Sequence, residues 1–150
     1  MKKTRNATFD DSAELSILFD EYTVFYHKES DVNSAENFLK ERLQNKDSEI
    51  YVAETDGKLV GFVQLYPLFS STRMKKYWLL NDLYVNVNSR GKGFSKELID
   101  EAKKLCRETA ASGILLETGK NNEIGNQLYP RSGFELYDSV NFYEWLNLDF

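Results

Sequence analysis

The sequence predicts an α/β fold in which helices pack on a mixed β-sheet, and three observations lead to this class. Two strand-like runs flank Asp56-Gly57, a dipeptide typical of a tight β-hairpin. A third strand-like run at about 76–87 precedes a helical pattern at about 93–111 and a short apolar run at 113–118. That succession predicts a right-handed β-α-β crossover. The 150 residues suit one compact domain.

The first part of the chain predicts a strand and two helices. A short strand is expected over about residues 3–9. Asp11 and Glu14 have the spacing of a capping box, which predicts a helix start and a helix over about 11–27. A second pair with the same spacing, Asn33 and Glu36, predicts another helix over about 34–45.

The second half predicts the rest of the sheet. The hairpin is the segment "EIYVAETDGKLVGFVQLYPL", and Gly113 is expected to end the long helix. A short helix over 122–131 follows, and "GFELYDSVNFYEWLNL" is expected to close the chain as two more antiparallel strands. The predicted order is therefore β-α-α-β-β-β-α-β-α-β-β.

Composition excludes several classes of protein. Apolar residues make up 41% of the chain and charged residues 29%, which favours a packed core over disorder. No stretch approaches the roughly 18 apolar residues that a membrane helix needs, and no apolar run follows the N-terminal lysines as in a secretory signal. A single cysteine, Cys106, allows no internal disulfide and no cysteine-based metal cluster. We therefore expect a cytoplasmic protein without metal and without membrane contact.

The charge distribution is uneven along the chain. The net charge of −5 argues against a nucleic-acid-binding protein, whose binding surface would be basic. Residues 10–36 carry eight acids against one base, whereas residues 86–110 carry six bases against four acids. This asymmetry fits either solvated helix faces or a cationic partner at one end and an anionic partner at the other.

The turn "SRGKGFS" at residues 89–95 lies between the third strand-like run and the long helix. A helix that begins directly after a strand presents unpaired backbone N–H groups and the positive end of its dipole. Gly91 and Gly93 leave room for a phosphate beside these groups, and Arg90 and Lys92 add positive charge. By itself the turn fits either a phosphate site or an ordinary strand-to-helix connection.

Two longer segments carry a family resemblance. The segment "LNDLYVNVNSRGKGFSKELI" resembles motif A of the GNAT superfamily of acyl-CoA-dependent N-acetyltransferases, with Ser95 at the usual Gly/Ala position. The segment "NEIGNQLYPRSGF" resembles motif B, with Gly125 in place of the usual alanine. The resemblance covers about residues 50–138, and looser similarity points to a bacterial branch related to polyamine and histone acetyltransferases.

The resemblance implies acetyl-CoA as co-substrate. The backbone groups of Leu83 and Val85 would pair with the pantetheine, and Tyr84 would face the other way. Asn122 would hydrogen-bond the pantetheine arm, and Gly125 would permit close approach of the ligand. The pyrophosphate would lie on the backbone N–H groups of the turn and first helical residues, Arg90, Gly91, Lys92, Gly93, Phe94, Ser95 and Lys96.

The resemblance also implies a direct transfer from the thioester to an amine. Tyr129 occupies the position of the family's general acid, although a buried aromatic under a helix is the simpler interpretation. Asn81 stands where the polyamine branch tends to have Glu, and Asn cannot accept a proton. The resemblance therefore does not identify the general base. Asp82 is the nearest carboxylate, but strict alternation points it away from Asn81 and Leu83. Glu117 on the adjacent strand is a second candidate, and proton removal by bulk water is a third route.

The acceptor is expected to bind between the first helices and the end of the sheet. Acids beside aromatic rings suit an alkylammonium ion, which predicts a small cationic amine as substrate. The alternatives are a protein lysine or N-terminal amine, a CoA-binding relative with little turnover, and a plain structural domain. Family resemblance further implies a homodimer. The substrate-binding candidates are Glu21, Tyr26, Asp31, Asn81 and Glu117.

Overall fold

The computed structural model describes residues 1–149, and its sheet has the order β1-β2-β3-β4-β5. Neighbouring strands are antiparallel except β4 and β5, which are parallel. The predicted α/β class with a mixed sheet is therefore confirmed. The strands of the described residues are β1 (Lys2–Asn6), β2 (Glu49–Thr55), β3 (Lys58–Ser70), β4 (Lys75–Val85) and β5 (Ile114–Leu115).

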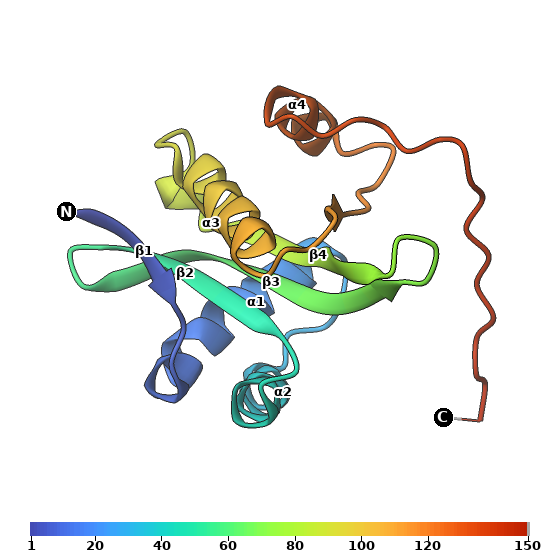
Figure 1. Cartoon of the computed structure of the whole chain (residues 1–150). Helices are drawn as coiled ribbons and strands as arrows, with labels where there is room; N and C mark the ends of the chain where they lie inside the picture. The colour runs from blue at the N-terminus through green and yellow to red at the C-terminus, as the bar shows by residue number, and fades with distance from the viewer. Residues whose placement is uncertain (150) are drawn as a thin grey trace. The chain divides into compact units, whose positions relative to one another are not determined.

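The chain divides into two compact units, Met1–Glu117 and Thr118–Phe150. The first unit holds the sheet and most of the helices (Figure 1), and the second holds one helix followed by an extended segment. The helical segments of the described residues are η1 (Phe9–Asp11), α1 (Ser12–Phe25), α2 (Val32–Asn45), η2 (Val87–Ser89), α3 (Phe94–Glu108) and α4 (Glu123–Arg131).

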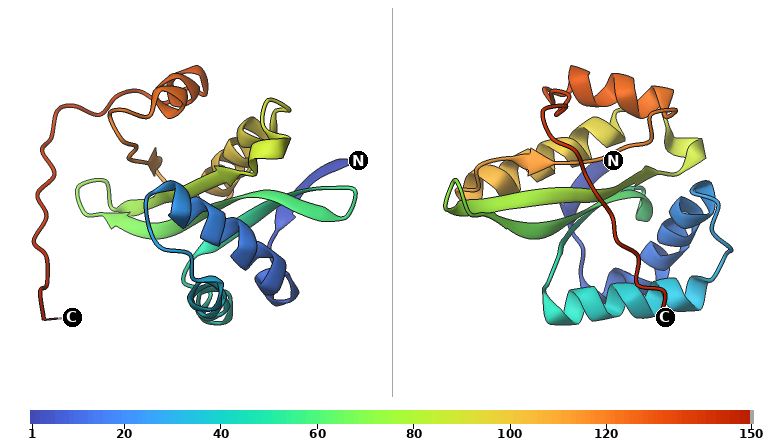
Figure 2. Two further views of the ribbon diagram at one scale, coloured as in Figure 1. Left: turned by 180° about the vertical axis from the view of Figure 1, so that it is seen from behind. Right: turned by 90° about the vertical axis from the view of Figure 1, so that its right-hand side faces the viewer.

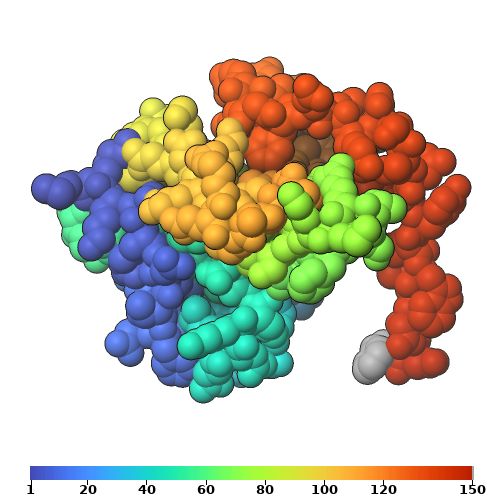
Figure 3. Space-filling view, in the orientation of Figure 1, coloured from blue at the N-terminus to red at the C-terminus, as the bar shows by residue number. Residues whose placement is uncertain are grey.

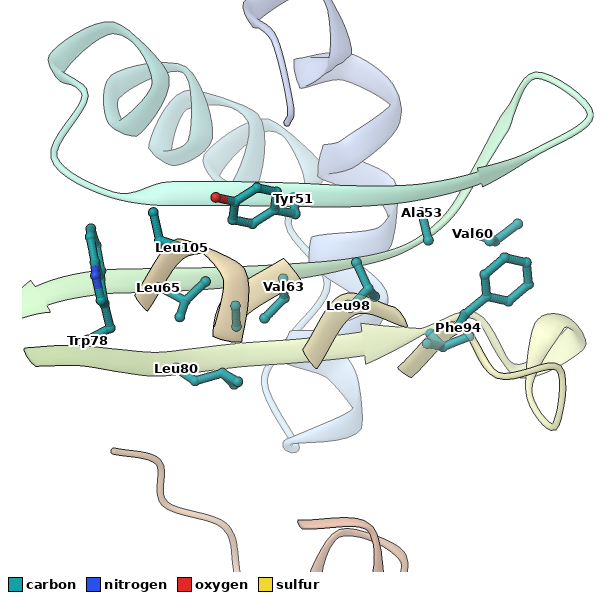
Figure 4. Close-up of a cluster of buried hydrophobic side chains, with 12 residues drawn as sticks. Tyr51, Ala53, Val60, Val63, Leu65, Trp78, Leu80, Phe94, Leu98 and Leu105 are labelled. Atoms are coloured by element: carbon teal, nitrogen blue, oxygen red, sulfur yellow. The ribbon is translucent and has the colours of Figure 1, made fainter. Parts of the chain in front are cut away.

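Helices cover both faces of the sheet in the first unit. Helices α1 and α2 pack on one face and α3 packs on the other, as the edge-on view of Figure 2 shows. The α3 face buries Leu98, Ala102 and Leu105, which the helical spacing predicts, against Trp78 of β4 (Figure 4). On the opposite face, side chains of α1 and α2 pack against Phe62 and its neighbours in β2 and β3.

A one-residue bulge interrupts the ladder between β3 and β4. Leu65 pairs with Leu80 and Gln64 pairs with Asp82, so Asn81 has no partner on β3. The bulge reverses the alternation of side chains along β4. Leu80 therefore packs in the α3 cluster, while Asp82, two positions later, hydrogen-bonds with Gln64 on the face that α1 and α2 cover.

Helices α1 and α2 begin within two residues of their predicted starts, but both predicted capping pairs are wrong. The carboxylate of Asp11 accepts from the backbone N–H of Thr8 at 2.7 Å, one turn earlier than predicted. Glu14 does not take part in a capping box, because its Oε2 accepts from the N–H of Leu59 at 2.8 Å and so ties α1 to the start of β3. Helix α2 begins at Val32, with the Asp31 side chain as its N-cap.

The prediction that Gly113 ends the long helix is wrong. Helix α3 ends at Glu108, and Ala110, with φ 51°, is the left-handed residue that follows it. Gly113 is required instead by packing, because a Cβ there would lie 2.7 Å from the ring of Tyr77 in β4. The helix end and the glycine are thus two separate features.

The two predicted closing strands are absent from the described residues. Residues 134–149 contain no strand, and most of their apolar side chains are exposed. Their aromatic and β-branched residues have high strand propensity, but propensity measures how well a side chain fits a paired and half-buried surface. Without a paired neighbour the segment remains extended coil.

A substitution at Gly61 tests how closely β3 approaches β4. A Cβ at this position would lie 2.8 Å from the carbonyl oxygen of Tyr84, a backbone atom that cannot move aside. We expect Gly61→Ala to lower the free energy of unfolding by about 1–3 kcal/mol, measured by urea denaturation. Gly119→Ala is the matched control, because nothing lies within 4 Å of a Cβ there. Equal stability of the two variants would contradict the close approach.

Candidate functional site

The edge of β4 is open beyond its contact with β5. The parallel ladder joins only Trp78 with Ile114 and Leu79 with Leu115. The remaining part of β4, Leu80–Val85, therefore has a strand partner on the β3 side alone. An open strand edge of this kind exposes backbone donors and acceptors to a ligand.

The backbone groups of Leu83 and Val85 point toward this open edge. Asn86 donates its N–H to the carbonyl of Val60 at 2.8 Å, which makes Val60 and Asn86 a hydrogen-bonded pair of the antiparallel ladder. Such pairs alternate, so the pairs that contain Leu83 and Val85 do not bond with β3. The Val85 carbonyl accepts instead from Nε of Arg90 at 3.0 Å.

The turn after β4 leads into an uncapped helix N-terminus. Gly91 and Gly93 both have left-handed backbone, with φ 77° and 85°, a conformation in which glycine is favoured. Gly93 is the N-cap residue of α3, and no side chain caps the helix there. The first N–H groups of α3 are therefore available to an anion, and a Cβ at Gly91 would meet nothing within 4 Å.

The side chain of Lys2 contacts this turn and the first turn of α3. The ammonium of Lys2 in β1 donates to the carbonyl of Lys92 and pairs with Glu97 of α3 at 3.2 Å. It also lies 5.0 Å from the ring centre of Phe94. In the space-filling view the N-terminal strand (dark blue) and the turn (yellow) form one surface (Figure 3). This contact could not be predicted from local sequence patterns, because Lys2 and Lys92 are 90 positions apart.

Asp82 is a buried carboxylate, 5% exposed, on the α1 face of the sheet. Its Oδ2 accepts from Nε2 of Gln64 at 2.8 Å, and its Oδ1 accepts from Nδ2 of Asn81 at 3.1 Å. The expectation that Asn81 points away from Asp82 is wrong, because the bulge brings the two side chains together. Burial raises the pKa of Asp82 above its ordinary value, although the hydrogen bonds from Gln64, Tyr22 and Asn81 act in the opposite direction.

Gln64 and Ser48 extend this network and were not predicted. Gln64 is fully buried, and its Oε1 accepts from the hydroxyl of Ser48 at 2.9 Å. Because this oxygen is engaged, the amide presents its NH₂ group to Asp82. The available signal was a single polar residue inside the apolar run "LVGFVQLY", which indicates a buried hydrogen bond.

Three tyrosines lie around Asp82. The hydroxyl of Tyr22 donates to the Asn81 carbonyl at 3.3 Å, and the ring of Tyr26 stands 5.0 Å from that of Tyr22, edge to face. Burial and, secondarily, the negative charge of Asp82 raise the pKa of Tyr26, and the same two causes raise the pKa of Tyr66 to about 12. The α1 side of β4 thus combines a buried carboxylate with aromatic walls.

Glu21 forms hydrogen bonds with two side chains at the end of β4. Its carboxylate accepts from the hydroxyl of Tyr84 at 3.0 Å and from the side-chain amide of Asn86 at 3.1 Å. Burial, followed by the bond to Glu21, raises the pKa of Tyr84. The guanidinium of Arg90 lies 5.7 Å from the Tyr84 ring centre. Tyr84 therefore faces α1, whereas Leu83 and Val85 pack with the α3 cluster.

Two other candidates lie apart from Asp82. The carboxylate of Asp31 caps α2, where it accepts from the N–H of Ser34 at 3.1 Å and from its hydroxyl at 2.7 Å. These bonds lower the pKa of Asp31. Glu117 is exposed and follows β5 by two residues. Of the five substrate-binding candidates, the structure places Tyr26 and Asn81 beside Asp82.

The motif B residues belong to the second unit. Asn122 is the N-cap of α4, where its Oδ1 accepts from the N–H of Gly125 at 3.0 Å and its Nδ2 donates to the Thr118 hydroxyl at 2.9 Å. A Cβ at Gly125 would lie 2.7 Å from this Nδ2, so the cap explains the glycine in place of alanine. Tyr129 is half-buried, and its ring packs edge to face with Phe134 at 5.9 Å.

Residues 1–149 contain neither a metal-binding cluster nor a helix that could span a membrane. This range contains no group of three or more His, Cys, Asp or Glu side chains that could hold a metal ion. Within the same range, no helix combines the length and the apolar character needed to cross a membrane.

Comparison with known proteins identifies the relatives of this chain. A family model described as "Acetyltransferase (GNAT) family" matches residues 14–134. An uncharacterized N-acetyltransferase of Bacillus subtilis (strain 168), YhfO, is 41% identical over 131 residues, which are 87% of this chain and 88% of that protein. A probable acetyltransferase of Haemophilus influenzae is 26% identical over 128 residues, with coverage of 85% and 86%.

A solved structure agrees with these sequences. The crystal structure of a probable acetyltransferase matches with a TM-score of 0.92 and 36% identity, and the match covers 98% of this chain and 99% of that one. The family model spans most of the chain, including both motif-bearing segments. The chain is therefore an acetyltransferase that belongs to the GNAT family.

Proposed function

We propose that this acetyltransferase takes its acetyl group from acetyl-CoA and moves it directly to a primary amine of a small cationic molecule. The observation that carries the proposal is the open β4 edge at Leu83 and Val85, which runs into the uncapped N-terminus of α3. A pantetheine amide chain can pair with such an edge as a strand would. A pyrophosphate at its end would then reach backbone N–H groups and the helix dipole.

The transfer needs a neutral amine and a protonated leaving thiol. The amine nitrogen attacks the thioester carbonyl, the C–S bond breaks, and the sulfur takes up a proton while the new amide nitrogen loses one. A free alkylamine is mostly protonated at pH 7, with a lysine-like pKa near 10.4, so a base beside the acetyl group accelerates attack. We assign this base to Asp82 and the general acid to Tyr129.

The acceptor class follows from the surroundings of Asp82. A carboxylate whose negative charge acts on Tyr26 and Tyr66, with Tyr22 bonded to the neighbouring Asn81, suits an ammonium group that gains charge attraction and cation–π contact. Asn81, which is exposed, donates a hydrogen bond from its side chain to Asp82. Protein lysine or N-terminal acetylation, and a CoA-binding role with little turnover, remain the alternatives that the assays below separate.

We further propose that the protein works in the cytoplasm as a homodimer on a small-molecule amine and without nucleic acid. The net charge of −5 supports the last point, because a nucleic-acid surface is basic.

Release of CoA from acetyl-CoA across a panel of amines tests the reaction. We expect turnover with polyamines and other cationic amines, and a loss of about 100-fold or more in kcat for Tyr129→Phe with unchanged acetyl-CoA affinity. Tyr77→Phe is the matched control and should retain full activity. Turnover with neutral amines or peptides alone would refute the acceptor class. Full activity of Tyr129→Phe would refute the general acid.

The pH profile tests Asp82 and its support by Gln64. A base acts only when deprotonated, so kcat/KM should fall tenfold per pH unit below the pKa of Asp82. Gln64→Leu removes a donor that stabilises the carboxylate, which raises that pKa and moves the acid limb to higher pH. Asp82→Asn should lose about 10²–10⁴-fold in activity and lack this limb.

Gln44→Leu, on the exposed side of α2, serves as the control for this experiment and should leave the profile in place. An acid limb that stays at the same pH in Gln64→Leu would separate Gln64 from the base. Full activity of Asp82→Asn would favour proton removal by bulk water.

Acetyl-CoA affinity tests the lysine that holds the turn. Lys2→Met removes the bond to the Lys92 carbonyl and the ion pair with Glu97. Because both partners are partly exposed, we expect only a two- to fivefold rise in Kd, about 1 kcal/mol or less, by titration calorimetry. Lys3→Met is the control, since Lys3 pairs with Glu54 on β2. A similar rise in both variants would indicate a general charge effect.

A further inference from the structure

Several acids of residues 10–36 accept hydrogen bonds within the fold. Two of them tie α1 to the sheet, since Glu14 accepts from the backbone of β3 and Glu21 accepts from side chains at the end of β4. A third acid of α1, Asp20, takes no part in the site described above, yet it is only 9% exposed. Because a buried carboxylate needs hydrogen-bond donors, the partners of Asp20 indicate its role.

Both carboxylate oxygens of Asp20 bind the end of the α1–α2 loop, which is defined as residues 26–31. Oδ2 accepts from the hydroxyl of Ser30 at 2.6 Å, and Oδ1 accepts from the backbone N–H of Asp31 at 2.7 Å. Asp31 is in turn the N-cap of α2, where its own carboxylate accepts from the N–H of Ser34. Asp20 therefore joins α1 to the first turn of α2 across the loop.

The beginning of the same loop contains a strained residue. Helix α1 ends in a Schellman motif, in which the N–H of Lys28 donates to the carbonyl of Thr23 at 3.0 Å. His27 takes the left-handed position of this motif, with φ 67°, where glycine is usual. Such a conformation persists only where the surrounding structure holds it. The two bonds from Asp20 provide this hold at the other end of the loop.

The loop carries Tyr26, one of the residues that lie beside Asp82. Tyr26 is the C-cap residue of α1, and its ring stands 5.0 Å from that of Tyr22 and 5.3 Å from that of Phe25. Burial and, after it, the negative charge of Asp82 raise the pKa of Tyr26. Because Tyr26 is the first residue of the loop, whatever fixes the loop also fixes the place of this ring.

We propose that Asp20 is a positioning residue for the amine acceptor: it fixes the α1–α2 loop and so holds the ring of Tyr26 beside the amine. Asp20 acts through the loop and not by contact with the substrate. The inference rests on the proposed function, in which the amine binds between Tyr26 and Asp82. A displaced Tyr26 weakens the binding of the amine equally before and during transfer, which raises KM for the amine at constant kcat.

Steady-state kinetics at saturating acetyl-CoA test this role. For Asp20→Ala we expect KM for the amine to rise about tenfold, with kcat within about twofold and the Kd of acetyl-CoA unchanged. Asp20→Asn should restore KM, because its amide oxygen can accept from the Asp31 N–H and its NH₂ group can donate to the Ser30 hydroxyl. Arg5→Met is the matched control, since it removes the ion pair with Asp11 before the other end of α1. An equal rise of KM in Arg5→Met or in Asp20→Asn would overturn the proposal.

A double-mutant cycle tests whether Asp20 acts through Tyr26. If it does, Asp20→Ala combined with Tyr26→Ala should raise KM for the amine no further than Tyr26→Ala alone. Additive effects of the two substitutions would overturn the positioning role, because they would show that Asp20 and Tyr26 act independently.

Hydrogen exchange tests the hold on the loop without reference to activity. The backbone N–H of Asp31 should exchange at least about tenfold faster in Asp20→Ala than in the wild type, and at the wild-type rate in Asp20→Asn. Unchanged exchange in Asp20→Ala would overturn the proposal. Normal turnover by the wild type with an unchanged amine KM in Asp20→Ala would overturn the positioning role alone. No turnover by the wild type with any amine would refute the proposed function and the positioning role together.

Discussion

The bulge at Asn81 decides which groups of β4 meet which face of the sheet. If side chains alternated strictly along β4, Asp82 would lie on the same side as Trp78 and Leu80, inside the apolar α3 cluster and without a donor. The bulge turns Asp82 to the α1 face, where Gln64 donates to it. The same shift turns the backbone groups of Val85 outward to the open edge. One unpaired residue thereby sets both the face on which Asp82 lies and the outward direction of the Val85 backbone groups.

Burial of Asp82 is tolerated because its oxygens have donors. A carboxylate removed from water without hydrogen bonds costs several kcal/mol, or it takes up a proton instead. Here Gln64 and Asn81 donate to separate oxygens, and Ser48 fixes the orientation of the Gln64 amide. The pKa of Asp82 is nevertheless raised, since burial outweighs these bonds. A raised pKa strengthens the carboxylate as a base, which is the property that the proposed reaction uses.

Local signals predicted most of the fold, and non-local pairing explains the rest. The hairpin at Asp56-Gly57 and the helix that follows the glycine turn each depend on residues close in sequence, and both are present. The bulge could not be predicted, because it is a difference in register between two strands. Gln64 and Lys2 act through distant partners for the same reason. The two predicted closing strands are absent because, in the described chain, their residues have no strand edge with which to pair.

The shortness of β5 leaves the edge of β4 open. A β5 that paired with all of β4 would cover the backbone groups of Leu83 and Val85 and leave no strand edge for a ligand. The two-residue ladder keeps that edge open, but it holds β5 itself by few hydrogen bonds. An additional strand on the outer side of β5 would stabilise it without touching β4. The geometry that leaves room for a ligand beside β4 therefore also leaves β5 weakly held in the sheet.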